Sequence, residues 1–237
     1  MSLSNVRAIL FDLDGTLYDQ TPLRILMAME LCTLPVRLRS LSKARDVIRA
    51  IRRFRSTREE LRDLGRPYHP LERLQYHQPA VEVGLDEFEM ERIIREWMYC
   101  RPLKYLKWCR RKGVVPLFAE AKQRGIQLGV FSDYPAKEKL QALELDAYAQ
   151  LVLCATDPEI NAFKPHPRGF LLACERWGIP PEEVLYVGDR PEVDAKGAEG
   201  AGMRCLIVGE RHEGKSPESK QEGQFISFQD LQHMLPT

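Results

Sequence analysis

The chain has 237 residues, 44% of them hydrophobic, so it is long enough to bury a substantial core. Its 35 Lys and Arg residues balance its 34 Asp and Glu residues, and a net charge of +1 gives no overall field to recruit nucleic acid or an anionic membrane. No apolar run approaches the roughly 18 residues of a membrane span, and the N-terminus lacks the pattern of a secretory signal. We therefore expect a soluble, cytoplasmic protein.

The first predicted element is a buried strand over residues 6–11, which runs directly into two carboxylates. The segment is short and largely branched or aromatic, as is typical of a parallel strand that is covered on both faces. Asp12 and Asp14 follow at its carboxyl end, where open α/β sheets bind ligands, and alternation along the chain points both side chains the same way. Such a pair needs a cation. Taken alone, the D-x-D-G-T pattern is also compatible with a turn in which both carboxylates cap loop amides.

Residues 20–110 show helical periodicity and no strand pattern, which predicts an all-helical insertion. Helices are expected over residues 21–34 and 86–108, the second interrupted at Pro102. Residues 66–84 carry three prolines between two flanking glycines, and this composition predicts a loop.

The one strongly basic stretch, residues 37–66, carries eleven Lys or Arg residues against four acids. Apolar residues recur in it at helical spacing, which predicts an amphipathic helix with a basic outer face. Arg45, Arg49 and Arg52 either belong to a solvated face or point inward at an anionic substrate.

An alternating strand and helix pattern resumes after residue 110 and predicts the α/β fold class. The core is expected to be a Rossmann-like parallel sheet of about five strands, flanked by helices and built from residues 1–19 and 111–237, with residues 20–110 as an inserted helical cap domain. After the first strand, the predicted strands are residues 126–131, 151–155, 184–187 and 204–208, and the predicted helices are residues 116–124, 136–143, 167–177 and a last one capped by Ser227, preceded by a mobile loop over residues 209–224.

The six cysteines are scattered, with no C-x-x-C pair and no histidine at the spacing of a zinc site. We expect reduced thiols that are mostly buried, because cysteine in an apolar segment behaves as a small hydrophobic residue.

Polar residues mark the ends of several predicted elements and together provide the parts needed for phosphoryl transfer. A carboxylate can attack phosphorus, a Mg²⁺ ion can hold the reactants and neutralise charge, and a lysine and a hydroxyl can stabilise phosphoryl oxygens. A second carboxylate can act as general acid and then as base. The residues at these positions are Asp12, Asp14, Ser132, Lys164, Asp189 and Asp194.

The order D-x-D-G-T, serine, Lys-Pro and G-D-x-x-x-x-D resembles the haloacid dehalogenase superfamily, specifically its phosphatase branch with a helical cap after the first motif (phosphoglycolate phosphatase-like). By this resemblance Asp12 is the nucleophile and Asp14 the acid/base. Ser132 and Lys164 hold the phosphoryl group. Asp14 also speaks against the dehalogenase branch, which lacks a second aspartate.

The same resemblance implies a Mg²⁺ site formed by the Asp12 carboxylate, the Asp14 backbone carbonyl and Asp189, with Asp194 ligating the ion or ordering its waters. One departure from the family pattern is Asp133, where many relatives have asparagine. We expect its backbone amide to serve the phosphate and its side chain to point elsewhere.

The resemblance therefore implies a Mg²⁺-dependent phosphatase that hydrolyses a small phosphorylated metabolite through an aspartyl-phosphate. A phosphomutase acting on a sugar phosphate by the same chemistry and a catalytically silent binding module of the same fold stay open as alternatives. No nucleic-acid or membrane partner is expected, and the sequence does not indicate an oligomeric state.

Overall fold

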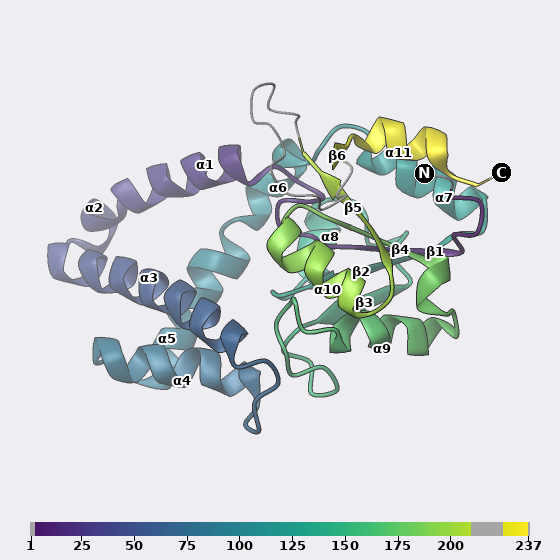
Figure 1. Ribbon diagram of the computed structural model, residues 1–237. Helices are drawn as coiled ribbons and strands as arrows, with labels where there is room; N and C mark the ends of the chain where they lie inside the picture. The colour runs from purple at the N-terminus through teal and green to yellow at the C-terminus, as the bar shows by residue number, and fades with distance from the viewer. Residues whose placement is uncertain (1–2, 210–224, 237) are drawn as a thin grey trace, which may run out of the picture.

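The computed structural model describes residues 3–209 and 225–236 and centres on a parallel sheet in the strand order β3-β2-β1-β4-β5-β6 (Figure 1). All five predicted strands are present, and a short sixth strand extends one edge. Most of the predicted loop over residues 209–224 lies outside the described residues. The strands are β1 (Ala8–Phe11), β2 (Gln127–Ser132), β3 (Leu151–Cys154), β4 (Val184–Gly188), β5 (Arg204–Val208) and β6 (Phe225–Ile226).

Strand β1 lies between β2 and β4 and is buried along its whole length. Its side chains alternate between two hydrophobic cores, one on each face of the sheet: Ile9 and Phe11 belong to the first, Ala8 and Leu10 to the second. Because all the strands are parallel, their carboxyl ends meet at one edge of the sheet, next to the helical segment in Figure 1. This edge is therefore where residues following β1, β2 and β4 come together.

Helices cover both faces of the sheet. The helix α11 ends the described chain and begins at Ser227, whose hydroxyl and Asp230 form a reciprocal capping box, as the sequence predicted. The helices around the sheet are α7 (Val114–Gln123), α8 (Lys137–Ala142), α9 (Arg168–Trp177), α10 (Lys196–Gly200) and α11 (Phe228–Met234), with a 3₁₀ turn, η2 (Pro181–Glu183), and a π-helical turn, η3 (Pro191–Ala195).

Residues 20–109 form a helical segment with a hydrophobic core of its own, which includes Phe54, Met90 and Trp97. The chain enters and leaves this segment at adjacent points, because the amide of Asp19 donates to the carbonyl of Cys109 over 2.9 Å. Its elements are α1 (Gln20–Cys32), α2 (Leu34–Leu38), α3 (Leu41–Asp63), α4 (Leu71–Val83), α5 (Glu87–Ile94), the π-helical turn η1 (Arg95–Cys100) and α6 (Leu103–Cys109).

The prediction of a loop over residues 66–84 is wrong, because α4 occupies most of this stretch. Pro70 precedes the first turn, where a missing N–H costs nothing, and Gly84 ends the helix in the left-handed conformation. Pro79 lies inside the helix but is buried, as is Val83 one turn later. Packing against α3 therefore outweighs the local cost of that proline.

The expectation of mostly buried cysteines holds only in part. Cys109 and Cys174 are buried, Cys154 and Cys205 are intermediate, and the remaining two, Cys32 and Cys100, are exposed on the helical segment. All six thiols are free. Within residues 3–209 and 225–236, no helix combines the length and the apolar character that crossing a membrane requires.

Candidate active site

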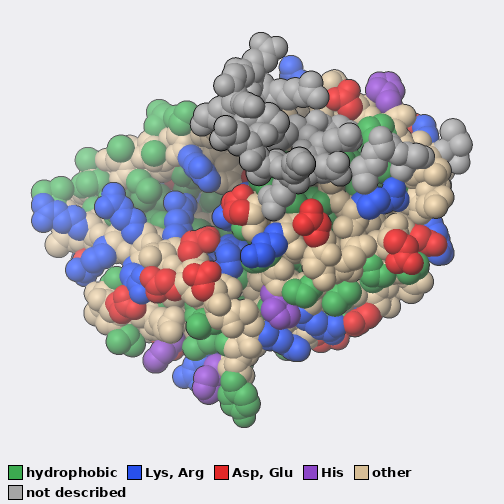
Figure 2. Space-filling view, viewed as in Figure 1, with side chains coloured by type: hydrophobic (Ala, Val, Ile, Leu, Met, Phe, Trp, Pro, Cys, Tyr) green, Lys and Arg blue, Asp and Glu red, His purple; other side chains and the backbone are tan. Residues whose placement is uncertain are grey.

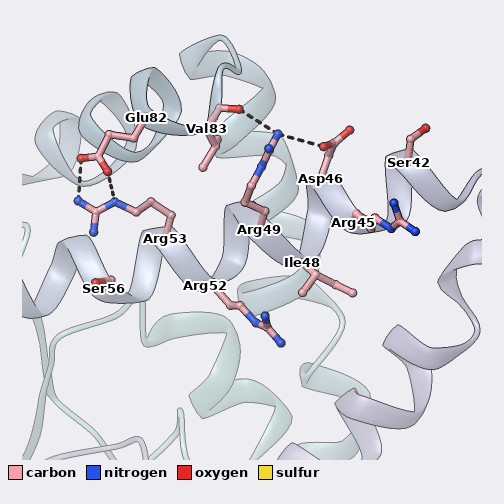
Figure 3. A pocket seen from close by; sticks show the side chains of 10 residues that line it. All are labelled: Ser42, Arg45, Asp46, Ile48, Arg49, Arg52, Arg53, Ser56, Glu82 and Val83. Atoms are coloured by element: carbon pink, nitrogen blue, oxygen red, sulfur yellow. Dashed lines mark hydrogen bonds and ion pairs between the residues drawn. The ribbon is translucent and has the colours of Figure 1, made fainter.

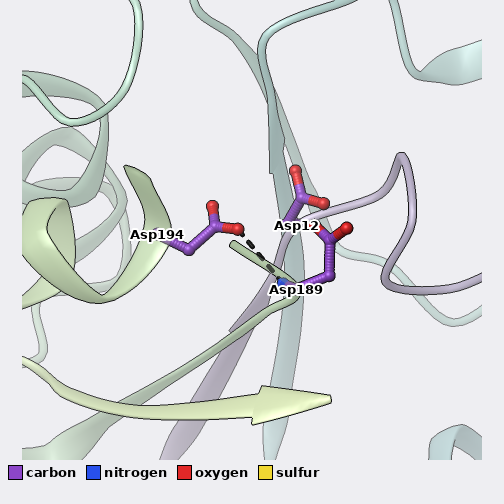
Figure 4. A group of neighbouring side chains, drawn as sticks. All are labelled: Asp12, Asp189 and Asp194. Atoms are coloured by element: carbon purple, nitrogen blue, oxygen red, sulfur yellow. Dashed lines mark hydrogen bonds between the residues drawn. The ribbon is translucent and has the colours of Figure 1, made fainter. Parts of the chain in front are cut away.

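Three aspartates meet at the carboxyl edge of the sheet (Figure 4). Asp12 follows β1, Asp189 follows β4, and Asp194 comes from the η3 turn. Each contributes a carboxylate oxygen that lies within 4.8 Å of the other two. Clustered carboxylates that are largely removed from water repel one another, and oxygen ligands of this kind suit a hard cation. The cluster can therefore hold a metal ion.

Asp12 is the best-anchored member of the cluster. Its amide donates to the Val187 carbonyl over 2.8 Å, which fixes the backbone at the end of β1. One carboxylate oxygen accepts from the Thr16 hydroxyl at 2.9 Å, and the other accepts from Lys164 Nζ at 2.5 Å. Burial raises the pKa of Asp12 well above its ordinary value, and the positive charge of Lys164 opposes this shift. The side chain is thus a fixed, desolvated carboxylate that depends on nearby positive charge.

Lys164 is 3% exposed and joins two of the carboxylates. Its Nζ donates to Asp12 at 2.5 Å, to Asp194 at 2.7 Å and to the Tyr186 hydroxyl at 3.0 Å. Burial disfavours its charged form, but the charges of Asp12 and Asp194 outweigh this and raise the pKa of Lys164. Tyr186 could not be identified as a site residue from the sequence, because a tyrosine inside a buried strand carries no signal beyond packing.

Asp194 and Asp189 differ in how their carboxylates are used. Both Asp194 oxygens are occupied by hydrogen bonds: one accepts from Lys164 and Tyr186, the other from the amides of Asp189 at 3.1 Å and Arg190 at 3.0 Å. Among the described residues, no group donates to the Asp189 carboxylate. Asp194 therefore shapes the loop after β4, and Asp189 is free to bind a cation.

The environment of Asp189 supports this role. Burial, and then the charge of Asp194, raises the pKa of Asp189 to about 6. Gly15 leaves space for the Asp189 carboxylate. The φ of Gly15 is +105°, and a Cβ on this residue would lie 2.2 Å from an Asp189 carboxylate oxygen. The D-x-D-G-T glycine thus serves both the tight turn and the approach of Asp189.

The Asp14 side chain makes contacts that are separate from those of the three clustered aspartates. One carboxylate oxygen accepts from Lys139 Nζ at 2.5 Å and from the Tyr18 hydroxyl, and the other accepts from the Ser132 hydroxyl at 3.3 Å. Its backbone carbonyl accepts from Gln20 Nε2 at 2.5 Å. Lys139, Tyr18 and Gln20 belong to no motif that the sequence analysis singled out.

Ser132 ends β2, and its hydroxyl also accepts from the amide of Tyr134 at 3.1 Å. The Asp133 side chain turns toward other partners: its carboxylate accepts from Arg62 Nη1 at 2.9 Å and from the Lys164 amide at 3.2 Å. Burial raises the pKa of Asp133, but the charges of Lys164, Arg62 and Arg58 outweigh it, and the net shift is downward.

Two arginines of α3 reach the sheet, and they are not the three that the sequence analysis named. Arg58 is 2% exposed and donates to the Asp133 carbonyl at 2.5 Å, with its guanidinium 4.0 Å from the Tyr134 ring centre. Arg62 forms the ion pair with Asp133. Both contacts join the helical segment to the loop after β2.

Arg45, Arg49 and Arg52 are exposed and line an open hollow on α3 that has a volume of about 1040 Å³. In Figure 3, Arg49 turns toward α4 and Arg52 points away from it. Arg49 pairs with Asp46 at 3.1 Å, and no contact joins any of the three to the acidic cluster. Figure 2 shows basic side chains spread over this end of the molecule rather than gathered in one place. A substrate contact by these arginines stays a prediction.

The family model of haloacid dehalogenase-like hydrolases matches residues 6–202, so the chain belongs to this family and is a hydrolase. The predicted family is thereby confirmed. The phosphoglycolate phosphatase of Shigella boydii serotype 4 (strain Sb227) is 27% identical over 253 residues, covering 98% of this chain and 92% of that protein.

Two crystal structures share the fold over nearly the whole chain. The HAD phosphatase from Thermococcus onnurineus has a TM-score of 0.66 at 24% identity, and the 2-haloacid dehalogenase from Pseudomonas syringae pv. Tomato DC3000 has a TM-score of 0.65 at 22% identity. In both cases 97% of each chain is covered. At these identities the likeness shows the fold and does not separate the two activities.

Proposed function

We propose that the chain is a Mg²⁺-dependent phosphatase that hydrolyses a small phosphate monoester through an aspartyl-phosphate on Asp12. The observation that carries the proposal is a buried, anchored Asp12 carboxylate that has Lys164 on one side and, on the other, the Asp189 carboxylate, to which no described residue donates a hydrogen bond. A dehalogenase needs no second aspartate at the position of Asp14. The phosphoglycolate phosphatase relatives support the same choice.

In the first step a carboxylate oxygen of Asp12 attacks phosphorus, an acyl-phosphate O–P bond forms, and the bond from phosphorus to the ester oxygen breaks. Lys164 places its charge beside the oxygens that become more negative. The leaving oxygen takes its proton from Asp14. In the second step Asp14 takes a proton from water, the water oxygen attacks the phosphoryl group, and inorganic phosphate leaves as the Asp12 carboxylate is restored.

The donor set fits Mg²⁺, because it consists of carboxylate and carbonyl oxygens and includes the Asp189 carboxylate, to which no described residue donates a hydrogen bond. Asp12, Asp189 and the Asp14 carbonyl would hold the ion, and Asp194 would orient Asp189 through its backbone amide. When bound, Mg²⁺ supplies positive charge that lets an anionic phosphate approach an anionic nucleophile.

Residues 20–110 are proposed to act as a cap over the site. Their separate hydrophobic core, the adjacent entry and exit of the chain, and the contacts of Arg58 and Arg62 with the loop after β2 support this role. A cap would exclude bulk water and select the leaving group. A cytoplasmic location and the lack of a nucleic-acid partner stay predictions.

The test is phosphate release from 2-phosphoglycolate and from an aryl phosphate, each with Mg²⁺ and with EDTA. The expected result is Mg²⁺-dependent release that Asp12→Asn abolishes. Asp146→Asn, at an exposed carboxylate between α8 and β3, is the matched control and should retain wild-type rates. Full activity in Asp12→Asn would refute the assignment. Isomerisation of a sugar phosphate without release would identify the mutase instead, and no turnover of any phosphate ester would favour the binding module.

A further inference from the structure

Lys139 is a buried lysine that none of the family motifs contains. It lies on α8 between exposed neighbours and the buried Leu140, and its side chain is 7% exposed. Its Nζ is 2.5 Å from an Asp14 carboxylate oxygen and 5.2 Å from the Tyr134 ring centre. Removing an ammonium group from water is costly unless nearby groups compensate, so a lysine held at this position needs a reason.

The hydrogen bonds of Lys139 are incomplete. An ammonium group has three N–H donors. Among the described residues, Asp14 is its only hydrogen-bond acceptor, and the Tyr134 ring offers a face rather than a lone pair. Lys164 is different, since its Nζ donates to three oxygens and its donors are all used. The two buried lysines therefore differ in their hydrogen bonds: Lys164 uses its donors beside the nucleophile Asp12, and Lys139 has spare donors beside the acid/base Asp14.

The position of Lys139 identifies the part of a substrate that it can meet. In the proposed reaction Asp14 hands its proton to the leaving oxygen, which must come within about 2.6–3.2 Å of it. A group one or two bonds beyond that oxygen then lies next to the Nζ that already contacts Asp14. An anionic group there would satisfy the spare donors with charge-assisted hydrogen bonds.

We propose that Lys139 is a specificity-determining residue that binds a carboxylate on the carbon next to the phosphate ester, so that the enzyme prefers phosphorylated 2-hydroxy acids. This inference rests on the proposed function. It assigns the recognition of the leaving group to α8 of the sheet domain, and not to the arginines of α3. Asp14 and the substrate carboxylate would share the one ammonium, which also keeps the leaving oxygen close to its proton donor.

The experiment compares 2-phosphoglycolate with its neutral amide, 2-phosphoglycolamide, by phosphate release with Mg²⁺. The wild-type kcat/KM should favour the acid by about 10- to 100-fold, the range of a charge-assisted hydrogen bond. Lys139→Met should bring this ratio close to one, and Lys139→Arg should restore much of it. Lys137→Met, at an exposed lysine on the same helix, is the control and should keep the wild-type ratio.

A merely structural role for Lys139 would slow both esters alike and leave the ratio unchanged, and that result in Lys139→Met would overturn the inference. If Lys139→Met does not fold, the wild-type ratio and Lys139→Arg still decide it, because a wild-type ratio near one overturns it without any variant. Equal kcat/KM values for the two esters would overturn this inference and leave the proposed function standing. Release from an aryl phosphate but from neither of these esters overturns the inference and leaves the proposed function standing, whereas release from no phosphate ester overturns both.

Discussion

The ion pair between Arg62 on α3 and Asp133 after β2 joins the helical segment to the sheet, and its strength can be measured. Arg62 Nη1 and an Asp133 carboxylate oxygen are 2.9 Å apart, and each side chain is 11% exposed. At this distance, with an effective dielectric of about 20, the attraction is roughly 6 kcal/mol. The loss of hydration of two ions cancels much of it, so a coupling energy of about 1–3 kcal/mol should remain.

A double-mutant cycle with Arg62→Met and Asp133→Asn tests this value by urea denaturation at neutral pH. Arg62→Met alone should lower the free energy of unfolding by about 2–3 kcal/mol, because it leaves a buried carboxylate with one partner fewer. Arg53→Met, whose guanidinium pairs with Glu60 and Glu82 on the surface, is a control that should cost about 1 kcal/mol or less. A coupling energy near zero would show that the segment is held without this pair.

Three further predictions concern stability and the metal site. Burial raises the pKa of Glu30, but hydrogen bonds from Lys104, Tyr105 and Arg101 lower it to about 2, so its stabilising effect is present above pH 4.5 and is lost as the pH falls toward 2. Glu30→Gln should therefore lower the free energy of unfolding by about 1–2 kcal/mol at pH 7, and denaturation curves should show this difference disappearing near pH 2. Gly15→Ala should reduce Mg²⁺ affinity or phosphate release about 10- to 100-fold, because its Cβ would displace the Asp189 carboxylate, and titration calorimetry that finds wild-type affinity would contradict this. Mg²⁺ at 100 times its Kd should raise the Tm by about 5–10 °C in calorimetry, EDTA should reverse the shift, and an equal shift in Asp189→Asn would place the ion elsewhere.

The sheet and most of the site could be predicted because each depends on local signals. Short apolar runs define buried strands, and parallel strands end at one edge, so Asp12, Lys164 and Asp189 are brought together wherever they lie in the sequence. The rule that parallel strands end at one edge of the sheet applies however the helices pack. It does not say how each carboxylate is used: both oxygens of Asp194, which joins the same cluster, already accept hydrogen bonds.

The residues that could not be predicted are those whose direction depends on packing between distant elements. Arg58 and Arg62 lie one turn apart on α3 and face the sheet, but the run of arginines around them gives no sign of which face is covered. Lys139 is buried and Lys137 is exposed, yet the two look alike in sequence. The error over residues 66–84 has the same origin, since proline content indicates a loop unless a neighbouring helix covers the turn.

The charges at the carboxyl edge of the sheet explain why a divalent cation suits it. Five carboxylates lie here: Asp12 and Asp194 share Lys164, Asp14 has Lys139, and Asp133 has Arg62, whereas no cation of the described residues forms an ion pair with Asp189. Two carboxylates thus share one ammonium, and a third lies in the same largely buried space without an ion-pair partner among the described residues. A divalent cation at Asp189 would offset this shortage of positive charge. The departure at Asp133 fits the same account, because Arg62 of α3 supplies an ion-pair partner for this extra carboxylate.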